Sequence, residues 1–255
     1  MKNVIILGAG RSGTSLSAGA LSEAGYFMGD DLLEARSTNP KGFFEDRHIN
    51  WLNERILFTQ MPLWRRMPYV GRLPSAVPGP NHMWLARVPL DSKLNKSKDV
   101  LDDIQALVVR EPFCFKDPRF SYTLPAWRPY LQNTVFLCVF RDPAVMIAST
   151  QKSLATAPYL ANLKLTAAHL NQTWELIYGH ILKRHRREGR WLFMHYEQFF
   201  DSTALKRLSE FAKAPVSGGF AERSLQRSPP ADCVSAANRA IYRELCEAAS
   251  YAPKQ

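Results

Sequence analysis

The chain has 255 residues, of which 46% are hydrophobic, so it can bury a sizeable core. We expect one domain over residues 1–255. Lys and Arg outnumber Asp and Glu by 33 to 23, a net charge of +10 that favours an anionic ligand. The chain lacks an apolar run long enough to span a membrane, a CxxC pair and a metal-binding motif, which argues against a membrane, disulfide or zinc protein. We expect a cytoplasmic protein with reduced thiols.

Short apolar runs alternate with segments of helical periodicity. The apolar runs predict strands at residues 4–7, 113–115, 134–140 and 191–196. The periodic segments predict helices at residues 14–24, 49–58, 100–109, 145–154, 163–185, 203–212 and 237–248. This alternation predicts an α/β fold of three layers, with a central, mostly parallel sheet flanked by helices. Ligands of such folds bind beyond the carboxyl ends of the strands.

Three other segments carry composition signals. Residues 29–48 form a polar loop that is long enough to be functional. Residues 61–90 are rich in proline and contain aromatic side chains, so we expect little regular structure there and a lid that could bind an acceptor. The basic run at residues 183–187 predicts a solvated helix end, where cations offset the macrodipole, rather than a nucleic-acid site.

The sequence Gly-Ala-Gly-Arg-Ser-Gly-Thr-Ser follows the first predicted strand and begins the first predicted helix. Its amides and the helix terminus can bind an anion. As a Walker A loop it places Thr14 where the nucleotide-binding Lys must be, which disfavours a kinase or ATPase. As a dinucleotide fingerprint it matches at Gly8, Gly10 and Gly13, with Asp30 or Asp31 as the ribose-binding acid. That match is weak, because residues 26–28 would form only a short second strand.

A third interpretation centres on the cation of Arg-Ser-Gly-Thr-Ser. This pentapeptide resembles the 5′-phosphosulfate loop of sulfotransferases, commonly written Arg/Lys-x-Gly-Thr-Thr/Ser. Fixed cationic, hydroxyl and amide donors suit a leaving phosphate that develops negative charge. The resemblance implies a P-loop-type fold and a donor loop made of Gly10, Arg11, Ser12, Gly13, Thr14 and Ser15.

A second anion site is predicted after the strand at residues 134–140. Arg141 ends this strand, and Ser149 follows about two helical turns later, so the two side chains could hold one phosphate. Phe-Arg-Asp-Pro followed by this Ser resembles the 3′-phosphate site of the same family. An ordinary ion pair between Arg141 and Asp142 is the alternative for this segment alone.

Two shorter matches agree in chain order. Phe-Lys-Asp-Pro resembles a segment of tyrosylprotein and related sulfotransferases, and the resemblance implies that Lys116 stabilises the leaving group. His-Tyr-Glu-Gln-Phe resembles a strand end of those enzymes at which Tyr196 would lie near the nucleotide. A structural salt bridge for Lys116 and a buried Tyr196 remain equally open. The four motifs span residues 4 to about 200 and resemble most closely the tyrosylprotein, carbohydrate and bacterial enzymes.

The sequence offers more than one candidate for the general base. Pro118 stands where cytosolic small-molecule sulfotransferases place a His. Carbohydrate and protein sulfotransferases use a Glu after the first helix, and Gly-Phe-Phe-Glu-Asp resembles one version of that segment. We favour Glu45, which neighbouring phenylalanines would partly desolvate, and take His48 as the second candidate. Asp31 and Glu34 stay open by spacing.

The combined motifs predict a sulfotransferase that uses 3′-phosphoadenosine 5′-phosphosulfate and releases 3′-phosphoadenosine 5′-phosphate, without a metal. The acceptor would be a hydroxyl or amine of a small molecule, carbohydrate or protein. The alternatives are a P-loop nucleotide kinase or other phosphotransferase, a nicotinamide or flavin protein, and a catalytically silent sulfotransferase-like module that binds nucleotide. Nucleic acid is not an expected partner, because the basic residues are dispersed. Residues 201–255 add no functional signal.

Overall fold

The computed structural model describes residues 1–36, 39–67, 73–221 and 234–253. Within these residues, four strands form one parallel sheet in the order β2-β1-β3-β4. Ile5 of the central strand lies opposite Phe115 on one side and Phe136 on the other. The strands are β1 (Asn3–Leu7), β2 (Cys114–Lys116), β3 (Thr134–Phe140) and β4 (Arg190–His195). The predicted α/β class and parallel sheet are confirmed.

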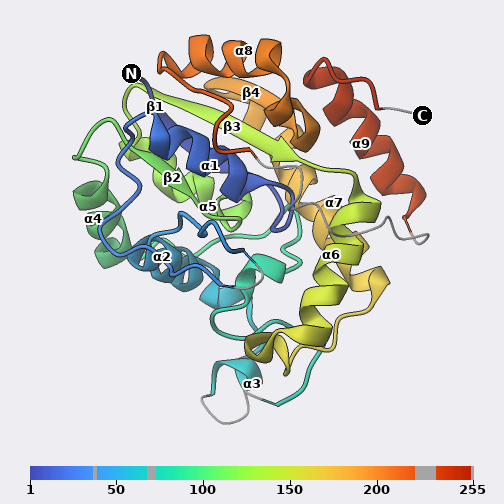
Figure 1. Cartoon of the computed structure of the whole chain (residues 1–255). Helices are drawn as coiled ribbons and strands as arrows, with labels where there is room; N and C mark the ends of the chain where they lie inside the picture. The colour runs from blue at the N-terminus through green and yellow to red at the C-terminus, as the bar shows by residue number, and fades with distance from the viewer. Residues whose placement is uncertain (37–38, 68–72, 222–233, 254–255) are drawn as a thin grey trace.

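Helices cover both faces of this sheet (Figure 1). Most of them begin and end within a few residues of the predicted bounds. The helices are α1 (Thr14–Glu23), α2 (Arg47–Leu57), α3 (Leu63–Arg66), α4 (Lys98–Leu107), α5 (Phe120–Trp127), α6 (Pro143–Thr156), α7 (Ala167–Lys183), α8 (Ser202–Ala212) and α9 (Ala236–Ala248).

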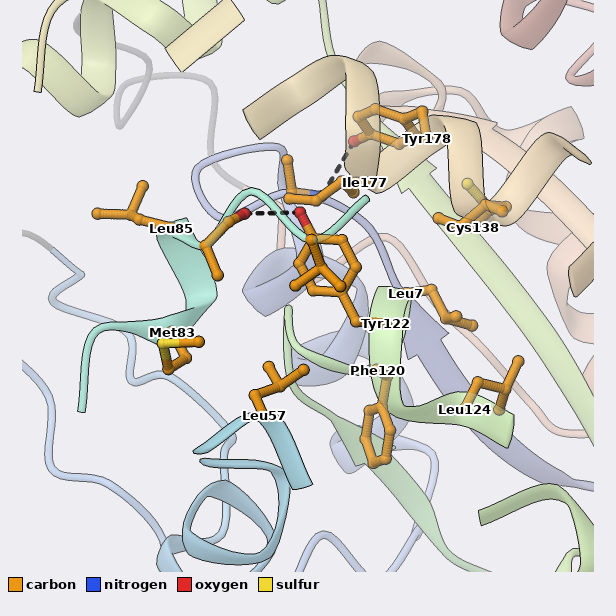
Figure 2. Packing of buried hydrophobic residues seen from close by; sticks show 14 of the residues in the cluster. Leu7, Leu57, Met83, Leu85, Phe120, Tyr122, Leu124, Cys138, Ile177 and Tyr178 are labelled. Carbon is orange, nitrogen blue, oxygen red and sulfur yellow. Dashed lines mark hydrogen bonds between the residues drawn. The ribbon is translucent and has the colours of Figure 1, made fainter. Parts of the chain in front are cut away.

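The alternation of side chains along β1 divides the core in two. Val4 and Ile6 pack with α1 and α8, whereas Ile5 and Leu7 pack with α2, α5 and α7. Figure 2 shows part of the second cluster, in which Leu7 lies among side chains of β3, α5 and α7. A strand that is buried on both faces needs apolar residues at every position, which explains the unbroken run that predicted it.

One helix that was not predicted, one helix boundary and one charge assignment differ from expectation. α5 was not predicted, because Pro125 lies inside it and its residues are buried on nearly all sides, without helical periodicity. α7 begins at Ala167 rather than residue 163, since the Thr166 side chain caps it. The basic run at residues 183–187 is not wholly solvated: His185 is buried, and its Nε2 donates to the Ser121 carbonyl at 3.1 Å.

Cys114, Cys138 and Cys246 are buried as free thiols, whereas Cys233 lies outside the described residues. Tyr69 of the proline-rich segment also lies outside them. Within the described ranges, none of the helices combines the length and the apolar character needed to cross a bilayer.

Buried histidines make the fold sensitive to acid. Burial lowers the pKa of both His185 and His195 to about 3, from an ordinary value near 6.5. The unfolded chain therefore binds more protons than the folded chain between these values, and stability falls as the pH falls below about 6.5. We expect urea unfolding to give a free energy at pH 5 lower by about 2 kcal/mol for each histidine than at pH 7.5.

Two substitutions test this pH dependence. His185→Gln keeps a donor for the Ser121 carbonyl but does not titrate, so it is expected to flatten the dependence. Gln60→Asn, at a partly exposed side chain that does not titrate, is expected to leave it unchanged. Equal slopes for wild type and His185→Gln would contradict the assignment.

Candidate functional site

All four strands end at one large cavity of about 760 Å³. The residues that follow or end the strands reach it from separate parts of the chain, as the α/β architecture predicts. Loop and helix residues after β1 contribute Gly10, Arg11, Gly13, Thr14 and Ser15; the other predicted residues in its wall are Glu45, Lys116, Arg141, Ser149 and Tyr196. Both predicted anion sites therefore share a single cavity.

The loop between β1 and α1 requires glycine at the points of closest approach. A Cβ at Gly10 would lie 2.7 Å from the Trp84 ring, and one at Gly13 would lie 2.6 Å from the Tyr196 ring. Gly13 also has a φ of 95°, a left-handed conformation that favours glycine. It precedes the first turn of α1, where the amides of Thr14 and Ser15 have no intrahelical acceptor and can bind an anion.

Ser12 behaves differently from its neighbours in the loop. Its side chain is buried and lies 3.2 Å from the Tyr178 hydroxyl, and its amide donates to the Ala9 carbonyl. It does not line the cavity, contrary to what its place in the motif suggested. The Tyr178 hydroxyl also accepts from the Ala9 amide and lies 3.0 Å from the Val139 carbonyl. Ser12 and Tyr178 thus support the loop from the core side.

Two arginines converge at the second predicted anion site. Arg11 Nε donates to Ser149 Oγ at 3.1 Å, which joins the loop after β1 to α6. The Arg141 guanidinium lies 4.3 Å from the centroid of the Tyr196 ring. Burial lowers the pKa of both arginines, and for Arg11 the nearby charge of Arg141 adds to the effect. Two partly desolvated cations so close together favour a bound anion.

Arg141 has an unsatisfied hydrogen-bond donor. Its Nη2 is buried and has no hydrogen-bond partner among the described residues. Buried donors of this kind are normally satisfied. The predicted 3′-phosphate of the donor nucleotide would supply acceptor oxygens here, so the residues present fit such a group.

Lys116 and Glu45 form a buried ion pair at the end of β2. Lys116 Nζ lies 3.3 Å from Ser15 Oγ, and Asn50 donates to the other carboxylate oxygen of Glu45 at 3.0 Å. The carboxylate is therefore held by α2 and β2 together. Phe43 lines the same cavity, whereas Phe44 packs edge-on against another ring, that of Phe220.

The remaining candidates for the base lie elsewhere. His48 Nε2 is 3.8 Å from Asp103, on a solvent-exposed part of α2. Asp31 pairs with Arg47 at 3.1 Å, and Glu34 is almost fully exposed. These three side chains are not part of the cavity wall. Among the sequence candidates, only Glu45 is brought next to Lys116 and the donor loop.

A buried network behind Lys116 was not foreseen. Asp117 accepts from Asn53 and from Arg119, both at 2.9 Å, and Arg119 Nε donates to Glu54 at 2.6 Å. Glu54 also accepts the amides of Asn81 and Met83, at 3.0 and 3.1 Å. The network links α2, the end of β2 and the proline-rich segment, and so positions the wall that carries Trp84.

His82, between those two amides, is a cavity residue that sequence reasoning missed. Its Nε2 lies 2.9 Å from the Tyr159 carbonyl, which can only accept, so this nitrogen carries the proton. Burial lowers the pKa of His82, which favours the neutral ring. No motif marks this histidine, and only its place in the proline-rich segment hinted at a role in an acceptor site.

Comparison with known proteins identifies the fold. Neither a scan of protein-family models nor a search of curated proteins finds a match. Among solved structures, the sulfotransferase domain of the Synechococcus PCC 7002 olefin synthase has a TM-score of 0.52 and 15% identity, covering 100% of this chain and 98% of that domain. The sulfotransferase domain from the curacin biosynthetic pathway has a TM-score of 0.56 and 14% identity, covering 99% of both. The chain therefore has the fold of a sulfotransferase domain.

Proposed function

We propose that this chain is a single-domain sulfotransferase that moves a sulfuryl group from 3′-phosphoadenosine 5′-phosphosulfate to an acceptor hydroxyl or amine. The observation that carries the proposal is the pairing of two sites in one cavity. Arg141 leaves a buried N–H without a partner among the described residues, beside Arg11 and Ser149. Lys116 and Glu45 lie in the wall of the same cavity.

Donor binding is assigned to two groups of residues. The first-turn amides of α1 and the Arg11 guanidinium would hold the 5′-phosphosulfate. Arg141 and Ser149 would hold the 3′-phosphate, and the Tyr196 ring, which already contacts Arg141, would border the nucleotide. The donor supplies the sulfuryl group and a bisphosphate that leaves with the electron pair of the broken S–O bond.

Glu45 would accept the proton of the attacking hydroxyl or amine as the new bond to sulfur forms. Lys116 lies between Glu45 and Ser15, so its ammonium can stabilise charge that develops on the leaving phosphate. Arg11 would contribute a second positive charge there. In this proposal two cations of the chain perform this role, and no metal ion is required.

A nucleotide screen tests the proposal against its rivals. We expect the bisphosphate product to raise the thermal unfolding midpoint in the absence of Mg²⁺, because a ligand that binds only the folded state stabilises it. ATP, NAD and NADP should raise the midpoint less at the same concentration. The proposal would be contradicted if NAD alone stabilised the chain, or if ATP did so and required Mg²⁺.

Substitutions at the second anion site test where the nucleotide binds. Arg141→Ala should weaken binding of the bisphosphate by about 1.5 to 3 kcal/mol, because a charge-assisted hydrogen bond is lost, and Ser149→Ala should weaken it less. Calorimetric titration measures both. Arg186→Ala, which removes the same charge from a surface pair with Glu244, is the matched control. Wild-type affinity in both site variants would show that the 3′-phosphate binds elsewhere.

A further inference from the structure

His82 has a hydrogen-bond acceptor that the chain does not use. The ring lies in the cavity wall, and its Nε2 donates to the Tyr159 carbonyl at 2.9 Å, so its Nδ1 keeps a lone pair. None of the described residues donates a hydrogen bond to this Nδ1. Partly buried polar atoms are normally satisfied by the protein, by water or by a ligand. A bound molecule with an O–H or N–H group can supply the missing donor.

The surroundings of His82 keep its ring neutral. Burial lowers the pKa of the ring, and the positive charges of Arg119 and Arg65 lower it further, against the opposing effect of the Tyr159 carbonyl. Protonation would turn Nδ1 into a donor, because both nitrogens of a charged imidazole carry hydrogen. At neutral pH the ring therefore accepts at Nδ1 and donates at Nε2.

The backbone on both sides of His82 is anchored. The Glu54 carboxylate accepts the amides of Asn81 and Met83, at 3.0 and 3.1 Å. Met83 itself is buried in the core cluster (Figure 2). A ring that is already held by its backbone and by a carbonyl loses little further freedom when a ligand binds. This preorganisation suits a contact that selects a ligand.

His82 and the proposed base lie near the same arginine. Burial opposes the charge of Arg119, but neighbouring carboxylates, that of Glu45 among them, raise its pKa. The same guanidinium lowers the pKa of His82. Arg119 is therefore within electrostatic range of both side chains, and all three residues line the cavity. A molecule bound in this cavity of about 760 Å³ can reach Glu45 and His82 together.

The wall next to His82 is aromatic. Tyr159, whose carbonyl holds the imidazole, is 38% exposed, and Trp84 lies two residues further along the chain, close to Gly10 of the donor loop. Trp51, at 49% exposure, belongs to the same wall. Aromatic rings in a cavity bind flat apolar groups by stacking. These rings and the Nδ1 lone pair suit an acceptor molecule better than the phosphates of a donor, which bring only further lone pairs.

We propose that His82 selects the acceptor by receiving a hydrogen bond on Nδ1 from a second O–H or N–H group of that molecule. The acceptor is then a flat, apolar compound with two neighbouring donors, one of which receives the sulfuryl group. This inference rests on the proposed function, in which Glu45 takes the proton of the reacting group. His82 binds the second group and takes no proton.

Nitrogen NMR of the chain with isotope-labelled histidine tests this contact without turnover. The chain is first saturated with the bisphosphate product, and the His82 signals are identified by their loss in His82→Gln. We expect the Nδ1 signal to move toward that of a protonated nitrogen when phenylethylene glycol is added. Hydratropyl alcohol, in which a methyl group replaces the second hydroxyl, should leave the signal unchanged. His185 has the same tautomer but lies outside the cavity wall, so its signals are an internal control.

Steady-state kinetics with the same two alcohols measures the selectivity. The wild type should use the glycol with a kcat/KM about tenfold higher, mainly through KM, because the methyl compound leaves Nδ1 without a partner. His82→Gln can still donate to the Tyr159 carbonyl but provides no acceptor in place of Nδ1, so it should lose this preference. His82→Asn, whose shorter amide places an oxygen near the position of Nδ1, should keep part of it. His48→Gln is the matched control outside the cavity wall and should behave as wild type.

The results separate this inference from the proposed function. Absence of bisphosphate binding would contradict the proposed function and this inference with it. Normal bisphosphate binding with an Nδ1 signal that does not respond to the glycol, or responds equally to both alcohols, would contradict the inference alone. A signal that already moves with the bisphosphate would place His82 in the donor site instead. Equal loss of kcat with both alcohols in His82→Gln and His82→Asn would identify a base rather than a residue that selects the acceptor.

Discussion

Glu45→Gln is expected to lower turnover by roughly 10² to 10⁴-fold, the usual contribution of a general base, while leaving nucleotide affinity near that of wild type. Gln keeps the size of Glu and can still accept from Asn50, but it cannot take a proton from the acceptor. The two readouts are turnover with an acceptor found by screening and calorimetric affinity for the bisphosphate. A drop in both together would assign Glu45 to donor binding instead.

The other candidate bases supply the comparison. Asp31→Asn, Glu34→Gln and His48→Asn change side chains outside the cavity wall, so each should turn over at the wild-type rate. His82→Asn tests a further candidate base, because His82 lies in the cavity wall and burial lowers its pKa, which favours the neutral ring. A full-speed Glu45→Gln enzyme together with an inactive His82→Asn enzyme would move the base to His82.

Lys116→Met should affect both stability and chemistry. Lys116 is the buried ion-pair partner of Glu45, and removal of one partner leaves the other charge buried and unpaired, at a cost of about 3 to 5 kcal/mol in the free energy of unfolding. Turnover should fall roughly 10² to 10³-fold, because a donor to the developing negative charge is lost. Urea unfolding and steady-state kinetics below the unfolding range measure the two effects.

The double variant Glu45→Gln with Lys116→Met separates the two effects. It removes both charges, so most of the lost stability should return, whereas turnover should stay low. Glu244→Gln with Arg186→Met alters an exposed ion pair and should change neither quantity appreciably. Wild-type turnover in stable Lys116→Met protein would remove Lys116 from the proposed mechanism.

The layout of the fold was largely predictable, because strands buried on both faces read as unbroken apolar runs. The run at residues 134–140 coincides with β3, and the residues that follow the strands were recognisable as site candidates. α5 was missed for the opposite reason: its burial on nearly all sides and its internal Pro125 remove the periodicity that identifies a helix. The buried His185 was hidden within a run of cations.

Residues of the site could be predicted only where they belong to a recognisable sequence motif. Arg11, Lys116 and Arg141 follow strands in recognisable patterns and all reach the cavity. The motif could not show that Ser12 turns toward Tyr178, 166 residues away, because that choice depends on packing between α7 and the loop. Contacts such as that of Arg119 with Glu54 join residues 65 positions apart and have no local signature.

The buried network of Asn53, Asp117, Arg119 and Glu54 also limits which residues of the cavity wall can be replaced singly. Replacement of Glu54 would remove one of the two carboxylate partners of Arg119 and the acceptor of two backbone amides at once, so one mutation there disturbs several contacts. Trp51 and Tyr159 contribute to the same wall but lie outside the network. If the proposed function holds, we expect substitutions at these aromatic positions to change the choice of acceptor one position at a time, without disturbing the network.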